Sequence, residues 1–214
     1  MMTMLDLVFC EQDRTSLLAA AAPGVAGVRP ADVLDDVIEE VLGLSLVTRP
    51  LPGRVLGLCY YDRGLITINS RMAQLVRPNT NLEGLTYSTK AHELAHLRWP
   101  HHEAEVRDAR RRNQPLDPAT EARREEEADF YAGIFLVPTA DLWAMPQVGD
   151  LLSSHPAAWT SDALWQVVLD LASRFRVTGS LMARRLGHLG LVEKSDDRSL
   201  RLALPHTLPR SALA

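Results

Sequence analysis

Residues 92–96 read His-Glu-Leu-Ala-His, an H-E-x-x-H motif, and this motif constrains the fold more than any other part of the chain. In an α-helix, residues four positions apart lie on the same face, one turn from each other. His92 and His96 can therefore bind one metal ion, while Glu93 is placed to hold a water molecule beside it. The motif predicts a helix with two histidine ligands, packed against an element that supplies a third ligand.

A later acidic run offers that third ligand. Residues 123–129 read Arg-Arg-Glu-Glu-Glu-Ala-Asp and fall within a second predicted helix, where Glu125 and Asp129 are four positions apart and share a face. We predict that Glu125 binds the metal, and that Asp129 accepts a hydrogen bond from Nδ1–H of a ligand histidine, which leaves Nε2 for the metal. Glu127 is the alternative third ligand. It points about 160° away from that face, so Glu125 and Glu127 cannot both reach one ion.

The composition is that of an ordinary globular protein. The 214 residues are 46% hydrophobic and 23% charged, which is typical of one main domain in water. Cys10 and Cys59 have no metal-binding or redox spacing and lie among apolar residues, so we expect buried free thiols. The N-terminus has no basic segment before its apolar run, and no stretch approaches the ~20 apolar residues that cross a bilayer. A cytoplasmic protein without a membrane partner is expected.

Charge is unevenly distributed along the chain. Residues 1–154 contain 15 Lys and Arg against 22 Asp and Glu, a net charge of −7, whereas residues 155–214 contain 8 against 5, a net charge of +3. An acidic body with a mildly basic tail is not the pattern of a dedicated nucleic-acid-binding protein. Direct binding to nucleic acid is therefore not expected.

The segment before the motif predicts a helix and a β-hairpin. Apolar residues repeat at three and four positions between Pro30 and Gly43, which indicates an amphipathic helix. Residues 55–60 and 65–69 favour strands, and Asp-Arg-Gly at 62–64 favours a turn between them. A sheet edge beside a metal-binding helix can hold an extended peptide as an added strand. A hairpin that only packs the core is an equal alternative.

The motif itself falls in a helix expected over residues 85–97, which Trp99-Pro100 ends. Residues 101–116 are polar and highly charged without a steady apolar period, so we expect a surface connection that can include a helical turn or two. Asp117-Pro118 resembles an N-cap followed by proline at the first helical position, which starts a helix that runs to about Val137.

Two further helices are expected over residues 160–175 and from Thr178 to about Leu189, separated by a short turn. Helix, turn and helix form a helix-turn-helix-like unit. The sequence thus predicts an α+β fold with a small β-hairpin or sheet and helices, followed by a small helical segment. The expected parts are an N-terminal segment with a short helix near Ala22, a metal-binding domain, the helix-turn-helix-like segment and a loosely ordered tail (1–30, 31–150, 151–193 and 194–214).

Residues 125–138 read E-E-E-A-D-F-Y-A-G-I-F-L-V-P, which resembles the signature of the ImmA/IrrE family, E-x-x-A-N/D-x-F-A-x-x-L-L-M-P after H-E-L-G-H. The first glutamate of that signature falls on Glu125 and its Asn/Asp position on Asp129. Ala95 stands for the usual glycine, tyrosine for the phenylalanine, and Phe-Leu-Val for Leu-Leu-Met. None of these changes removes a predicted ligand. The resemblance covers residues 31–140 well and the tail weakly.

This resemblance implies a zinc metallopeptidase of the zincin type, gluzincin-like in its ligands, with Glu93 as the catalytic carboxylate. Characterised members cleave helix-turn-helix repressors. The resemblance therefore implies a repressor as the protein substrate, and release of stress, phage or mobile-element genes from repression. Zinc suits two histidines and a glutamate, and manganese also accepts this mixed nitrogen and oxygen set.

Two classes of function follow from these residues. In a metal-dependent endopeptidase, Glu93 takes a proton from water as general base and returns it to the leaving amine. In a non-catalytic regulator, of the DNA-binding, partner-binding or toxin–antitoxin type, the metal only stabilises the fold. Glu93 favours the peptidase, because a purely structural metal site does not need it. The last predicted helix carries only Arg184 and Arg185 as strong cations, which argues against DNA binding.

Overall fold

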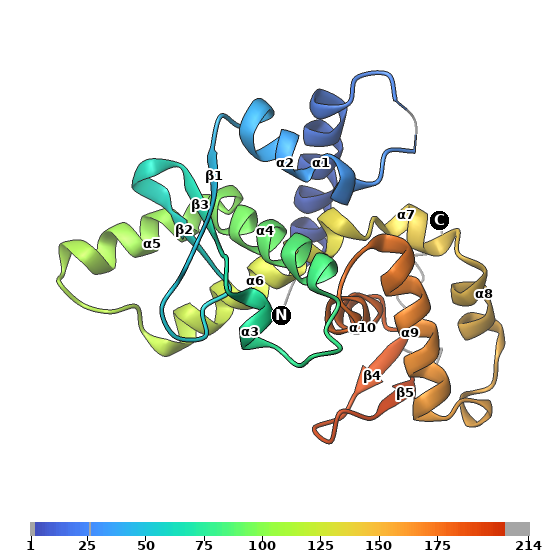
Figure 1. Cartoon of the computed structure of the whole chain (residues 1–214). Helices are drawn as coiled ribbons and strands as arrows, with labels where there is room; N and C mark the ends of the chain where they lie inside the picture. The colour runs from blue at the N-terminus through green and yellow to red at the C-terminus, as the bar shows by residue number, and fades with distance from the viewer. Residues whose placement is uncertain (1–2, 26, 204–214) are drawn as a thin grey trace.

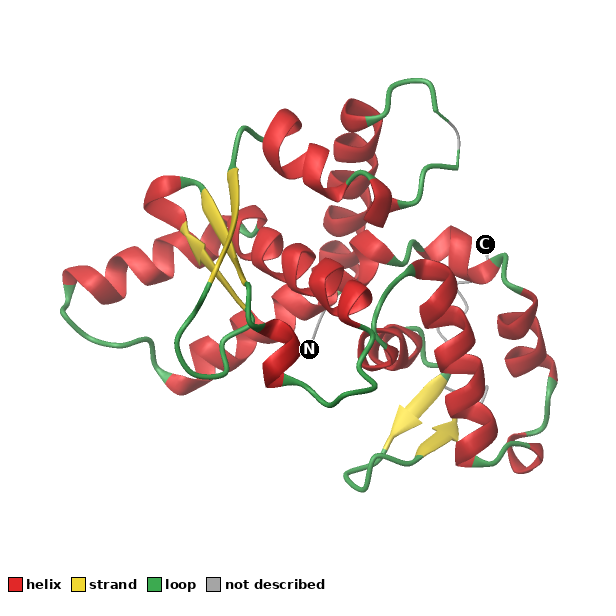
Figure 2. Cartoon of the chain, in the orientation of Figure 1, coloured by secondary structure: helices red, strands yellow, loops and turns green. Residues whose placement is uncertain are grey.

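The apolar patterns of the chain fold into a mostly helical α+β protein with two small sheets (Figure 1, Figure 2). The computed structural model describes residues 3–25 and 27–203. A three-stranded sheet lies beside the helices that carry the H-E-x-x-H motif and the acidic run, and a two-stranded sheet lies near the C-terminal end. Among the described residues, no helix is both long and apolar enough to span a membrane.

The N-terminal segment forms a longer helix than the sequence predicts. Helix α1 runs over Met4–Ala21, and Thr3 begins it with a capping box in which Thr3 and Asp6 bond each other's backbone N–H. Within α1 only Cys10 and Leu17 are fully buried. Such sparse burial gives a weak apolar period, which explains why only the end of this helix was predicted.

The segment from Pro30 to Gly43 is helical, but it is made of three short turns of different pitch. They are a 3₁₀ turn, a single α turn and a π turn (η1, Pro30–Asp32; α2, Leu34–Asp36; η2, Val37–Val41). Gly43 follows with φ 63°, the left-handed conformation that glycine adopts most readily after a helix. The expected helix is therefore present as a helical segment with an irregular backbone.

The main sheet contains the predicted hairpin and one strand that was not predicted. Strands β2 (Gly57–Tyr60) and β3 (Leu65–Asn69) are antiparallel and are joined by the 3₁₀ turn η3 (Tyr61–Arg63). Strand β1 (Ser45–Arg49) pairs with β3 in parallel, which gives the order β1-β3-β2. Strand β3 is central and largely buried, whereas β1 is exposed at all but one position. Strand β2 is an edge strand and packs against the helix that carries the motif.

The two predicted site helices are found close to their expected limits, with an extra helix between them. The four helices of this region are α3 (Met72–Leu75), α4 (Leu82–Arg98), α5 (Pro100–Arg111) and α6 (Pro118–Leu136). The side chains of Asn81 and Asp117 cap α4 and α6. The expected surface connection over 101–116 is instead mostly helix α5, because Pro100 starts a new helix as well as ending the previous one. Helices α4 and α6 pack against each other along most of their length.

The C-terminal part contains the predicted helix pair and a hairpin. Helices α9 (Ser161–Phe175) and α10 (Gly179–His188) are capped by Thr160 and Thr178. A loosely ordered tail was expected from residue 194, but Lys194 pairs with Leu200 and residues 200–202 form a strand. Residues 204–214 lie outside the described residues. The remaining elements are α7 (Thr139–Trp143), α8 (Pro146–Ser153), η4 (Pro156–Ala158), β4 (Val192–Lys194) and β5 (Leu200–Leu202).

The C-terminal helices pack directly on the helices of the site. Helix α10 lies against α6, and one continuous apolar core extends from α1 to β5. Gly84 in α4 is so close to the turn between α9 and α10 that a Cβ at this position would stand 2.6 Å from the carbonyl carbon of Val177. The core is thus continuous across residue 150, where the sequence suggested a boundary.

Candidate metal centre

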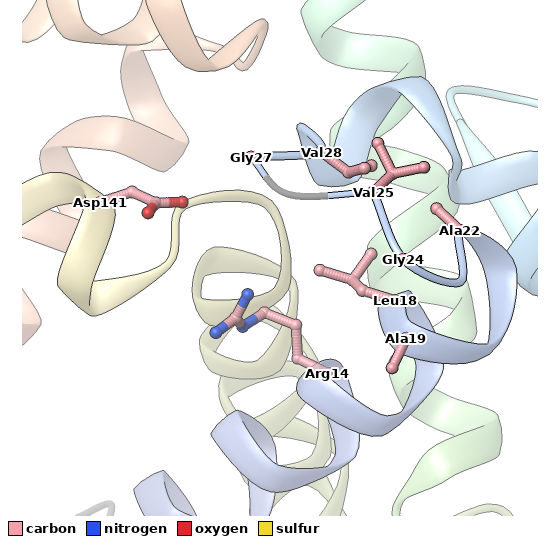
Figure 3. A pocket seen from close by; sticks show the side chains of 9 residues that line it. All are labelled: Arg14, Leu18, Ala19, Ala22, Gly24, Val25, Gly27, Val28 and Asp141. Atoms are coloured by element: carbon pink, nitrogen blue, oxygen red, sulfur yellow. The ribbon is translucent and has the colours of Figure 1, made fainter.

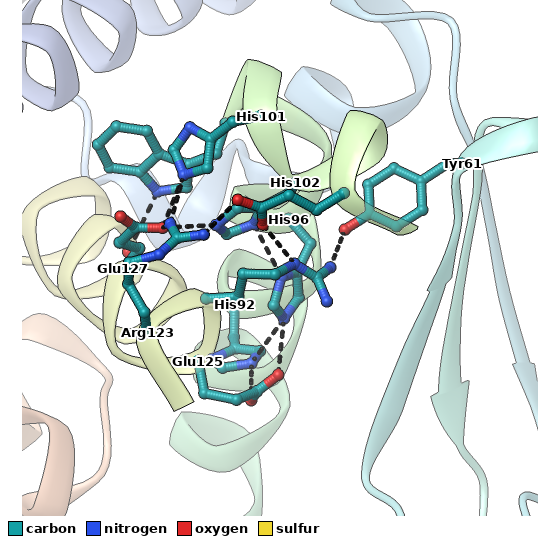
Figure 4. A network of polar contacts seen from close by, with 11 residues as sticks. Tyr61, His92, His96, His101, His102, Arg123, Glu125 and Glu127 are labelled. Atoms are coloured by element: carbon teal, nitrogen blue, oxygen red, sulfur yellow. Dashed lines mark hydrogen bonds and ion pairs between the residues drawn. The ribbon is translucent and has the colours of Figure 1, made fainter. Parts of the chain in front are cut away.

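Helices α4 and α6 bring His92, His96 and Glu125 together (Figure 4). Nε2 of His92 lies 3.1 Å from one carboxylate oxygen of Glu125, and Nε2 of His96 lies 3.3 Å from the other. The two Nε2 atoms are 3.2 Å apart. The side chain of His96 is 7% exposed and that of Glu125 is 54% exposed, so the group is open to solvent on the glutamate side.

These distances fit a tetrahedral metal site. Zinc–nitrogen and zinc–oxygen bonds of about 2.0–2.1 Å at tetrahedral angles place neighbouring ligand atoms about 3.3 Å apart. The two Nε2 atoms are 3.2 Å apart, and each lies 3.1 or 3.3 Å from a different oxygen of Glu125, so all three side chains are close enough to share one ion. A metal ion could be held by Nε2 of both histidines and the Glu125 carboxylate.

Glu127 does not share this group. Its Oε2 lies 2.8 Å from Nε2 of His101 and 2.8 Å from Nε2 of His102, two histidines of α5. The two residues of helical rotation between Glu125 and Glu127 separate their carboxylates in the way that helix geometry requires. Of the two alternatives for a third ligand, the structure therefore places Glu125 next to the motif histidines.

Asp129 lies where it can orient His92. Its Oδ1 is 3.0 Å from Nδ1 of His92, and its other oxygen forms an ion pair with Arg184 of α10. A histidine that donates Nδ1–H to a carboxylate carries its free lone pair on Nε2, the atom that faces Glu125. The sequence predicted the contact between Asp129 and a motif histidine, whereas the pairing with Arg184 was not foreseen.

Hydrogen bonds and burial shift the protonation of the three candidate ligands. Burial alone would lower the pKa of His92, but hydrogen bonds with Asp129 and Glu125 outweigh it and raise this pKa to about 10. Burial lowers the pKa of His96, against a hydrogen bond with Glu125. Hydrogen bonds from His92 and His96 hold the pKa of Glu125 well below its usual range. In the metal-free protein the centre thus holds an ionised carboxylate, a charged His92 and a neutral His96 at neutral pH, and His92 must lose a proton before its Nε2 can bind a metal.

Glu93 occupies a different environment from the ligands. It is 8% exposed and lies against Gly57 of β2. Burial raises the pKa of Glu93 to about 7, although the charge of His92 and the backbone N–H of Cys59 oppose the shift. A carboxyl group with a pKa near 7 is suited to both accept and return a proton at neutral pH.

A cleft of about 290 Å³ lies between β2 and the site helices. Its lining includes Glu93, the three candidate ligands, Tyr61 and Arg124. The hydroxyl of Tyr61 accepts a hydrogen bond from Arg124, and both side chains line the same cleft as the metal centre. Sequence reasoning missed Tyr61 and Arg124, because they come from η3 and α6 and no local spacing links them to the motif.

The two cysteines are free thiols, as the sequence predicted. Cys10 is buried in α1 and Cys59 is half-buried in β2. Burial raises the pKa of each thiol to about 12, and for Cys59 the nearby charge of Glu93 adds to this effect. Both thiols therefore stay protonated at neutral pH, and neither is suited to act as a nucleophile or metal ligand.

A larger hollow of about 500 Å³ lies away from these residues, between α1, the loop after it and α7 (Figure 3). Arg14 and Asp141 are the charged side chains among the described residues that line it. Arg14 is already bonded to Glu11 within α1. This hollow shares no lining residue with the metal centre and brings no group of catalytic side chains together.

Comparisons with known proteins support the fold. No family model matches the sequence, and no curated protein matches it. A solved structure described as a Mycobacterium tuberculosis transcriptional regulator superposes with a TM-score of 0.56 at 17% identity. The match covers 94% of this chain and 56% of that one, so this chain spans little more than half the length of that structure. At this identity the likeness shows a shared fold. The similarity to the ImmA/IrrE signature remains a resemblance of motifs.

Proposed function

We propose that this chain is a zinc-dependent endopeptidase of the zincin type. The observation that carries this proposal is the arrangement of His92, His96 and Glu125 at metal-ligand spacing, with the buried carboxyl group of Glu93 in the same cleft. The residues that resemble the ImmA/IrrE signature supply one ligand of this group and the partner of another, Glu125 and Asp129.

Each residue has a defined part in this proposal. A bound zinc ion would lower the pKa of water toward roughly 7 and polarise the scissile carbonyl group. Glu93 accepts the proton of the attacking water and returns it to the amine that leaves when the peptide bond breaks. Asp129 keeps Nε2 of His92 directed at the metal. Tyr61 and Arg124 add donors for the oxygen of the substrate carbonyl group.

The form of the cleft favours a peptide in extended conformation. Strand β2 is an edge strand, and it borders the cleft through Gly57, Leu58 and Cys59. An extended segment can add to such an edge through main-chain hydrogen bonds. We propose that the substrate is a helix-turn-helix repressor, as the family resemblance implies, and that cleavage releases a stress, phage or mobile-element regulon from repression.

If a helix-turn-helix repressor is encoded beside this gene, a cleavage assay with that repressor tests the proposal. Wild type and Glu93→Gln are compared with Zn²⁺, with Mn²⁺ and with a chelator. Cutting by wild type alone, abolished by the chelator, is the expected result, and Glu93→Gln should keep its metal. His92→Ala and Glu125→Ala should both lose metal affinity, because each removes a proposed ligand. Equal cleavage by wild type and Glu93→Gln would contradict the role of Glu93.

A metal-stabilised regulator without catalytic activity is the second candidate. The likeness to a structure described as a transcriptional regulator, together with helices α9 and α10, favours it. The two arginines of α10 argue against DNA binding by this helix, because Arg185 is buried and Arg184 forms an ion pair with Asp129. Tight binding of the repressor by both wild type and Glu93→Gln, without any cutting, would favour the regulator.

A further inference from the structure

His96 faces two groups through its two ring nitrogens. Its Nε2 points to His92 and Glu125, and its Nδ1 lies 3.1 Å from Nδ1 of His102 (Figure 4). If Nε2 is the ligand atom, the proton of the neutral ring must be on Nδ1. His96 then donates this hydrogen bond, and Nδ1 of His102 accepts it.

His102 in turn donates a hydrogen bond to the carboxylate of Glu127. Because its Nδ1 accepts, His102 carries its proton on Nε2, which lies 2.8 Å from Oε2 of Glu127. Arg123 donates to the same oxygen at 2.6 Å. The side chain of His102 is fully buried and that of Glu127 is 14% exposed, so the chain of hydrogen bonds is shielded from water.

His101, His102 and Glu127 also form the second His/Glu group among the described residues that could hold a metal ion. A neighbouring arginine argues against an ion there. Arg123 lies 2.8 Å from Nε2 of His101 as well as touching Glu127, so a guanidinium group already fills the place of a cation.

We propose that Glu127 and His102 are positioning residues for the metal, and that they orient His96 through the relay Glu127–His102–His96. The two candidate histidine ligands are then supported in different ways. Asp129 holds His92 directly, whereas Glu127 holds His96 through an intervening imidazole. This inference rests on the proposed metal centre and adds a role for His102 and Glu127, neither of which is among its three candidate ligands.

Zinc affinity of the full chain, measured by competition with a chromophoric chelator, tests the relay. Replacement of His102 by phenylalanine fills the space but cannot accept from His96, and should weaken zinc binding about 10–100-fold. Glu127→Gln should weaken it in the same direction. His101→Phe is the matched control: His101 touches the same Glu127 oxygen without touching His96, so its loss should change the affinity less than about threefold.

His102→Gln provides a rescue, because its amide can accept from His96 and donate to Glu127. It should bind zinc more tightly than His102→Phe. The visible spectrum of the Co²⁺-loaded protein should change for His102→Phe and not for His101→Phe. A general loss of stability would not produce this difference between the two variants. If His102→Phe fails to fold, Glu127→Gln and His102→Gln still carry the test.

Three results would overturn the relay. They are unchanged zinc affinity in both His102→Phe and Glu127→Gln, an equal loss in His101→Phe, and two zinc ions per wild-type chain of which His101→Phe removes one. All of these readouts are independent of peptide cleavage. Failure of the relay therefore appears as a change in metal binding, while failure of the peptidase proposal appears as absent cutting by a protein that binds zinc.

Discussion

Gly57 lies directly against the carboxyl group of Glu93. A Cβ added at Gly57 would stand 2.8 Å from Oε1 of Glu93 and 2.7 Å from Cγ2 of Thr89, both closer than real Cβ atoms approach. Strand β2 and helix α4 therefore meet so closely at Gly57 that a larger residue would require the side chain of Glu93 or Thr89, or the strand, to move.

Gly57→Ala should consequently displace Glu93 or β2 and reduce cleavage about 10–100-fold, because a shift of about 1 Å in a catalytic group has effects of this size. Zinc affinity should change little, since the three atoms nearest to the added Cβ belong to Thr89 and Glu93 and not to a candidate ligand. Gly149→Ala is the control, because a Cβ there meets open space. Full activity of Gly57→Ala would show that Glu93 can move without loss of cleavage. This result would contradict a general base that must act from one fixed position.

Metal binding should release a proton from His92. Hydrogen bonds with Asp129 and Glu125 outweigh burial and raise the pKa of His92 to about 10, so the metal-free ring is charged at pH 7. A ligand imidazole must be neutral, and a metal therefore competes with this proton. Affinity for zinc should rise as pH rises from 6 to 8, by up to about tenfold per pH unit.

Calorimetry in buffers of different ionisation enthalpy measures this release directly, and about one proton per zinc is expected at pH 7. His96 contributes none, because burial lowers its pKa and the ring is already neutral. Asp129→Asn removes one of the bonds that raise the pKa of His92 and should reduce the release. A zinc affinity that is flat between pH 6 and 8 would contradict the assignment of His92 as a ligand.

Much of the candidate site could be predicted because its information is local. His92, Glu93 and His96 lie within one helical turn, and Glu125 and Asp129 lie within another. Two helices with strong caps need only pack face to face to bring these sets together, and the apolar positions of α4 and α6 direct that packing. Helix periodicity also separates Glu125 from Glu127, which the structure places on different groups.

The parts that sequence reasoning missed are mostly exposed or depend on contacts distant in the chain. Helix α5 buries only His102 and Ala109, so it has no apolar period that could reveal it. Strand β1 is an exposed edge strand for the same reason. The role of His102 follows from where α5 turns back onto α4, and the pairing of Arg184 with Asp129 follows from the packing of α10 on α6. Neither relation has a sequence spacing of its own.

Asp129 contacts both His92 and Arg184, and the two contacts should contribute differently to zinc affinity. Asp129→Asn replaces the carboxylate that orients His92, and zinc affinity should fall about tenfold or more. Arg184→Ala should change it less than about threefold, because the Arg184 side chain is 49% exposed and solvent screens such a pair. Chelator competition measures both variants. An equal loss in Arg184→Ala would mean that α10 controls the metal centre through this ion pair.

Arg185, the neighbour of Arg184, should have the opposite profile, with a large effect on stability and a small one on metal binding. Its side chain is 1% exposed. Nε donates to the carbonyl oxygen of Val137 at 3.1 Å and Nη2 donates to the hydroxyl of Thr139, so Arg185 joins α10 to the end of α6 and the start of α7. Burial lowers its pKa to about 10, which leaves it charged at neutral pH.

Arg185→Met keeps much of the buried volume but leaves the Val137 carbonyl group without its donor. It should lower the free energy of unfolding by about 2–4 kcal/mol, the range for breaking a buried, charged hydrogen-bond network. Urea unfolding should be measured in chelator, because bound zinc would add its own stabilisation to the folded state. Arg184→Ala, with its exposed side chain, is the matched control and should unfold close to wild type. Wild-type stability of Arg185→Met would show that α10 is held to α6 by its apolar face alone, without help from the buried guanidinium group.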